Sequence, residues 1–156
     1  MMRAPTPDPI GDPSGYQRHL LSLLGDDDPA EVQAATPAAW RAILAEAGEL
    51  LAVPPEPGEW SALQCLGHAT DAEIVYAGRY RWIVAHDEPP LIGYDQDQWV
   101  ERLHRDAEDD PDALLLVFET LRRANLALWT RATPRTRPVS ACTPSAVRRA
   151  WTFRSG

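Results

Sequence analysis

Fifteen prolines are spread along this 156-residue chain, and their positions decide which segments can form regular structure. A proline is tolerated in the first turn of a helix, but it stops a helix that reaches it. Some follow a capping residue, as in Asp28-Pro29, Thr36-Pro37 and Asp110-Pro111, which is the pattern of a helix start. Others form Pro54-Pro55 and Pro89-Pro90, where a helix must end. The prolines therefore predict a series of helices with short connections.

Apolar residues recur at helical spacing between these prolines, and no stretch shows the two-residue alternation of a strand. The longest expected helix begins at Ser61, with Gln64 completing a capping box, and ends before Asp87. The other helices are expected near residues 16–24, 37–53, 95–103 and 111–129, with a brief helical turn after Asp28. We therefore predict an all-α protein, a small antiparallel bundle.

Composition divides the chain into a flexible Pro-rich arm (1–14), a helical bundle domain (15–132) and a basic, Arg/Pro/Ser-rich divergent tail (133–156). Residues 1–130 contain all 23 acidic residues and nine arginines, a net charge of −14, whereas residues 131–156 have six arginines and no acid. An acidic body does not attract nucleic acid by counterion release, so no nucleic-acid partner is expected.

No run of residues approaches the roughly 18 apolar residues of a membrane span, and the N-terminus has no apolar signal segment. Cys65 and Cys142 are the two cysteines, far apart in sequence and outside any CxxC motif. We therefore expect a cytoplasmic protein with reduced thiols and no membrane partner.

The helix that begins at Ser61 carries the strongest candidate site, because His68 and Asp71 lie one turn apart. On a helical wheel the face around His68 mixes polar and apolar groups: Gln64, Asp71, Ala72, Val75, Arg79, Trp82, Ile83 and His86. Such a face suits the wall of a partly buried polar pocket between helices. His68 is a candidate metal ligand, with Asp71 as a second ligand or as a partner that orients it.

The same pair also has a purely structural interpretation, as an ordinary pair of neighbours on a helix. A divalent metal site needs at least three protein ligands, and the chain has no HxxxH, HExxH or paired CxxC motif. Cys65 is more simply a buried structural cysteine than a nucleophile. The other histidines are scattered: His19 on the first helix, His86 in a last turn that suits the helix dipole, and His104 in an acidic, arginine-rich stretch expected at the surface.

Three stretches together resemble the DinB-like superfamily. They are the tryptophan and H-x-x-D-x-E motif of residues 60–73, the Arg-Tyr-Arg of residues 79–81, and the P-P-x-x-x-Y-D-x-D-x-W loop of residues 89–99. Members of that superfamily have a similar tryptophan before the helix and a similar loop after it. The resemblance covers roughly residues 16–130.

The resemblance implies an up-down-down-up four-helix bundle with a divalent metal, nickel or zinc, at one end of its core. Relatives include S-transferases and isomerases that use a low-molecular-weight thiol such as mycothiol, bacillithiol or glutathione. The metal there binds and deprotonates the thiol to make a nucleophile. His68 matches the first metal-binding histidine of the family.

The chain departs from the family where the last helix is expected. That helix normally supplies two more ligands as an H-x-x-x-H pair, but residues 135–156 contain no histidine. The sharp change of composition suggests that the C-terminal helix is replaced or incomplete, through a frame change near residues 131–136 or a truncation.

Three hypotheses follow from this departure. The first is an enzyme of thiol-transferase ancestry, inactive or completed across a homodimer by His19, His86 or His104. The second is a non-catalytic helical interaction domain whose arginine tail contacts an acidic partner. The third is a degraded remnant of the family fold.

Overall fold

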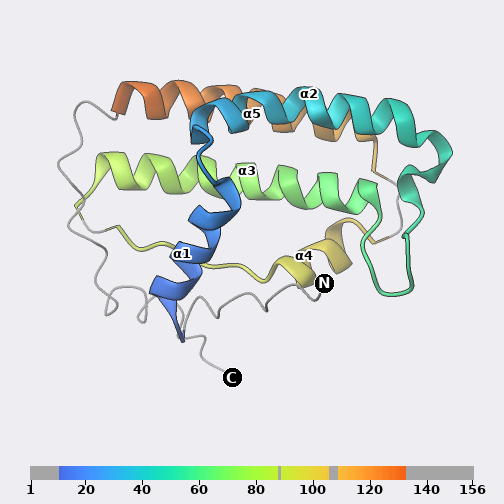
Figure 1. The fold of residues 1–156 in the computed structure, drawn as a ribbon, viewed down its shortest axis with the longest axis horizontal. Helices are drawn as coiled ribbons and strands as arrows, with labels where there is room; N and C mark the ends of the chain where they lie inside the picture. The colour runs from blue at the N-terminus through green and yellow to red at the C-terminus, as the bar shows by residue number, and fades with distance from the viewer. Residues whose placement is uncertain (1–10, 88, 106–108, 133–156) are drawn as a thin grey trace.

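The computed structural model describes residues 11–87, 89–105 and 109–132 of the chain, and its elements are helices (Figure 1). They are α1 (Pro13–Leu24), α2 (Pro29–Ala47), the 3-10 helix η1 (Gly48–Ala52), α3 (Ala62–Ala85), α4 (Gln96–Leu103) and α5 (Pro111–Ala132). Since no strand occurs in these three ranges, the all-α prediction is confirmed. None of the described helices has the length and apolar character needed to cross a membrane.

The starts of α3, α4 and α5 are where the capping residues predict them. Ser61 Oγ accepts a hydrogen bond from the backbone N–H of Gln64 at 3.2 Å, and Gln64 Oε1 accepts one from the backbone of Ser61 at 2.9 Å. Asp95 caps α4 through the backbone N–H of Gln98 at 3.0 Å, and Asp110 caps α5 in the same way. Each cap satisfies N–H groups that have no partner within the helix.

The N-terminal helices differ from the prediction at two prolines. Thr36-Pro37 does not start a helix, because α2 begins at Pro29 and continues through Pro37. Asp28 caps α2 by accepting hydrogen bonds from the two N–H groups that follow Pro29. The helix is therefore already formed where Thr36 and Pro37 occur. Pro13 belongs to α1 and not to an extended arm, since Asp12 caps that helix through the N–H of Gly15 at 2.8 Å.

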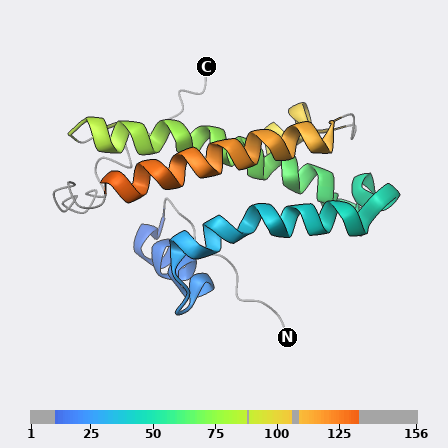
Figure 2. The same ribbon diagram turned by 90° about the horizontal axis from the view of Figure 1, so that it is seen from above.

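Helix α5 lies between α3 and α2 and packs against both (Figure 2). Its buried Leu115 and Phe118 meet Leu66 of α3, and Trp40 and Leu44 of α2 cover this cluster from the other side. The core therefore lies near the start of α3 and α5, close to the end of the bundle that holds His68.

Away from this core, large apolar side chains are exposed within the described residues. No residue of α2 is buried, and the large side chains of Trp82 and Trp129 are 41% and 47% exposed. The predicted arm up to residue 10 and the predicted tail from residue 133 lie outside the described residues.

Candidate functional site

The capping box fixes the first turn of α3 and so fixes where His68 lies. The ring of Trp60, one residue before the cap, lies 5.2 Å from the ring of His68, centroid to centroid. Because Ser61 is almost fully buried, this end of α3 is held by its surroundings as well as by its cap.

His68 is partly buried, and its Nδ1 is a buried atom with no hydrogen-bond partner among the described residues. Burial lowers the pKa of His68 below its ordinary value, although the carboxylates of Asp71 and Asp97 act in the opposite direction. His68 is therefore neutral at physiological pH, with a ring nitrogen free to accept a proton or a metal ion.

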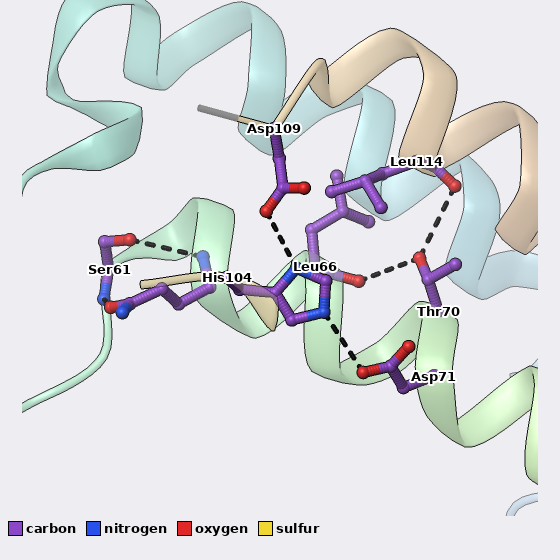
Figure 3. A network of polar contacts seen from close by, with 8 residues as sticks. Ser61, Leu66, Thr70, Asp71, His104, Asp109 and Leu114 are labelled. Carbon is purple, nitrogen blue, oxygen red and sulfur yellow. Dashed lines mark hydrogen bonds and ion pairs between the residues drawn. The ribbon is translucent and has the colours of Figure 1, made fainter. Parts of the chain in front are cut away.

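Asp71 does not pair with His68 but with His104, at the C-terminal end of α4 (Figure 3). The distance from His104 Nε2 to Asp71 Oδ2 is 3.1 Å, and His104 Nδ1 lies 2.7 Å from Asp109 Oδ2, just before α5. One imidazole thus joins α3, α4 and the start of α5.

The two carboxylates determine the charge of His104. Burial alone lowers the pKa of His104, but its hydrogen bonds to Asp109 and Asp71 outweigh burial and raise the pKa above the ordinary value of 6.5. The protonated ring donates through both nitrogens, so it satisfies both carboxylates. The positive charge of His104 in turn lowers the pKa of His68.

Gly67 allows α4 to come this close to α3. A Cβ atom built at Gly67 would lie 2.6 Å from Cγ and Nδ1 of the His104 ring, a distance that real Cβ atoms do not adopt. The glycine next to His68 is therefore required for the position of His104.

The prediction that His104 lies on the surface is wrong, since it is only 7% exposed. The acidic and arginine-rich neighbours of His104 suggested a solvated stretch. The sequence signal that was missed is the apolar residue Val100, one turn before His104 on the same face of α4. In the structure Val100 is 1% exposed.

His86, by contrast, is exposed at the C-terminal end of α3, about 27 Å along the helix axis from His68. His86 is therefore too far from His68 to share a site with it, although both lie on the polar face predicted for α3.

A second polar cluster joins α3 to α5 and was not predicted. Glu73 is 6% exposed, forms an ion pair with Arg122 at 2.7 Å and accepts a hydrogen bond from Asn125 Nδ2 at 2.9 Å. Arg81 donates a hydrogen bond to Asn125 Oδ1 at 3.3 Å. Glu73 follows Leu66 by two helical turns, so its burial follows from the apolar face of α3.

The described residues do not fit a complete metal centre. They contain no group of three His, Cys, Asp or Glu side chains placed to hold an ion, and an oxygen of Asp71 is already bound to His104. Residues 133–156 contain no His, Asp or Glu, and Cys142 is the one donor of this kind in that segment. His68 supplies one suitable donor, whereas protein metal sites use three or four.

Comparison with known proteins identifies the fold. A model of the DinB superfamily matches residues 28–154. The chain is similar to YfiT from Bacillus subtilis, a probable metal-dependent hydrolase with an unusual four-helix bundle topology. The TM-score is 0.59 at 21% identity, and the match covers 65% of this chain and 58% of YfiT. No curated protein matches.

Proposed function

We propose that this chain, which belongs to the DinB superfamily, is a non-catalytic member that keeps the helical bundle but does not by itself hold a catalytic metal. The observation that carries this proposal is the binding of Asp71 by His104. It engages one oxygen of Asp71, the expected neighbour of His68, and no three donor side chains come together among the described residues.

Both activities that the family suggests depend on a bound metal. Low-molecular-weight thiol transfer needs the metal to hold the thiolate, and hydrolysis, suggested by the similarity to YfiT, needs it to activate water. A single imidazole binds nickel or zinc weakly. We therefore propose that nickel or zinc and a thiol cofactor are absent from the working protein.

The role that remains is that of a helical interaction domain. Residues 131–156 bear six arginines and no acidic residue, beside a body with a net charge of −14. Arginine-rich segments bind carboxylate and phosphate groups. An acidic partner is therefore the proposed target of this segment, and a pull-down that loses the partner on deletion of residues 135–156 would support this.

Metal analysis of the purified protein tests the proposal. We expect well under one nickel or zinc per chain by mass spectrometry, and titration calorimetry should show weak binding that His68→Ala changes little. One tightly bound metal per chain that is lost in His68→Ala would overturn the proposal.

A second candidate function is a metal-dependent enzyme whose site is completed by residues outside the described part or by a second subunit. The buried Nδ1 of His68 favours it, because a buried nitrogen without a partner is costly unless something binds it. Thiol-transfer and hydrolase assays on zinc-loaded and nickel-loaded protein separate the two candidates, since activity that His68→Ala abolishes supports only the second.

A further inference from the structure

Helix α1 exposes an apolar surface that the rest of the described chain does not cover. Gly15 is its only buried residue, whereas Leu20, Leu21 and Leu23 are 47%, 59% and 56% exposed. Three half-exposed leucines on a helix of 12 residues form a patch of the kind that marks an interaction site.

A groove with a volume of about 390 Å³ lies between α2 and α5, away from the candidate site. Its uncharged lining residues are apolar or small, and Leu116 among them is 65% exposed: Ala34, Pro37, Leu116, Thr120 and Leu126. No residue of α1 lines it. The part of α5 from Leu116 to Leu126 rises about 15 Å and α1 about 18 Å, so the two helices have comparable lengths and α1 can lie against the groove with part of its surface.

The edge of the groove is positively charged. Arg41, Arg122 and Arg123 line it together with a single acid, Glu119, which is paired with Arg41. Arg122 is paired with Glu73, whereas Arg123 is exposed and has no ion pair within the described ranges. On a chain with a net charge of −8, this edge is a place where an acidic surface can approach without repulsion.

The segment that follows α1 has the complementary charge. Asp26 and Asp27 are exposed next to the leucines, and Asp28 is engaged as the cap of α2. Helix α1 and its aspartates are thus an apolar helix with an acidic end, whereas the groove is an apolar surface with a basic edge.

We propose that α1 of one copy of this chain docks in the α2–α5 groove of a second copy. Each copy has one helix and one groove, so reciprocal exchange forms a closed twofold dimer. The leucines then cover Leu116 and Leu126, and Asp26 and Asp27 come near Arg123. No residue of the His68 region takes part, so this inference does not depend on the proposed function.

Self-association of matched variants tests the docking. The wild-type chain should be a dimer by light scattering, and Leu20→Ser with Leu23→Ser, or Leu116→Glu, should weaken the dimer at least about tenfold. Leu103→Ser on α4 is the control, because Leu103 is 57% exposed but lies in neither surface. A monomer at all concentrations, or a dimer that both sets of variants leave unchanged, would overturn the proposal.

Charge reversal tests which surfaces meet. Arg123→Asp alone and Asp26→Arg with Asp27→Arg alone should each weaken the dimer, and the combined variant should restore it. Failure of the combined variant to recover affinity would contradict the proposed pairing.

Cross-linking distinguishes docking of α1 in the groove of a second copy from docking in the groove of its own chain. In a background with Cys65→Ser and Cys142→Ser, chains with Leu21→Cys should form a disulfide with chains that carry Thr120→Cys. Placing both cysteines on one chain should also give linked dimers. A link within one chain would show that α1 docks in its own groove and would overturn the exchange.

Discussion

His104 is the residue on which the geometry of the candidate site depends most. It replaces His68 as the partner of Asp71, and it also holds Asp109, so a single ring fixes the approach of three helices. The sequence predicts the positions of His68 and Asp71 on α3, because periodicity and capping are local. It does not predict their partner, because His104 is 33 residues from Asp71 and the contact depends on packing.

Replacement of His104 by glutamine should lower the free energy of unfolding by about 2–4 kcal/mol near pH 6, since the buried carboxylate of Asp71 and the half-buried carboxylate of Asp109 lose an ionised partner. The folded-state pKa of His104 is raised, so its contribution is complete below about pH 6.5 and is lost as pH rises through the folded pKa. Urea denaturation of both proteins from about pH 6 to pH 9 measures this. A difference that grows toward alkaline pH would contradict it, and exposed His86→Gln is the control.

Gly67→Ala should destabilise the fold by about 1–3 kcal/mol, because the new methyl group would overlap the His104 ring. Gly78→Ala is the matched control on the same helix. Its Cβ would lie 3.7 Å from the ring of Trp82, so higher helix propensity should make it neutral or stabilising by up to about 1 kcal/mol. Thermal unfolding compares the two, and equal effects would argue against the close approach of His104.

At the scale of elements, the capped helices were predictable and the interior of α2 was not. Asp95 and Asp110 cap α4 and α5 by local hydrogen bonds that sequence spacing shows directly. Pro37 gave the wrong prediction because the same residue type suits a helix start and can also be tolerated inside a helix. The Asp28 cap decides between the two, because it starts α2 at Pro29 and the helix is already formed where Pro37 occurs.

Pro37→Ala should stabilise the protein by roughly 1–3 kcal/mol, since alanine restores a backbone hydrogen bond inside α2, although part of the gain is offset by a freer unfolded chain. Circular dichroism during urea denaturation measures both helicity and stability. A loss of stability would show that the proline ring itself is needed for packing.

Glu73→Leu should cost roughly 3–5 kcal/mol, because Arg122 would stay buried without its carboxylate and Asn125 would lose an acceptor. Glu119→Leu is the control on α5, since its partner Arg41 is 58% exposed and such pairs contribute at most about 1 kcal/mol. Equal losses of unfolding free energy in chemical denaturation would mean that the Glu73 cluster does not stabilise the packing of α3 on α5.

At the scale of the molecule, the chain has a well-packed pair, α3 and α5, and a loosely packed N-terminal half. The all-α class could be predicted from the prolines and from the absence of alternation. The weak packing of α2 could not, because its apolar residues recur as they would in a buried helix, whereas none of its side chains is buried in the structure.

Hydrogen exchange should reflect this division. Amides in α3 and α5 should exchange slowest, and those of α1 and α2 should exchange faster by orders of magnitude, because few buried contacts oppose their local opening. Mass spectrometry of peptides after timed labelling measures the order. Equal protection of α2 and α5 would contradict it.

The contacts between α3 and α5 also affect how the chain folds. Thr70 and Leu114, and Glu73 and Asn125, are 44 and 52 residues apart in sequence, so their contacts close long loops. Because His104 lies between these helices in sequence and binds Asp71 on one and Asp109 beside the other, it divides the long closure into two shorter ones. The imidazole that binds Asp71 therefore also shortens the loop that must close when α5 packs on α3.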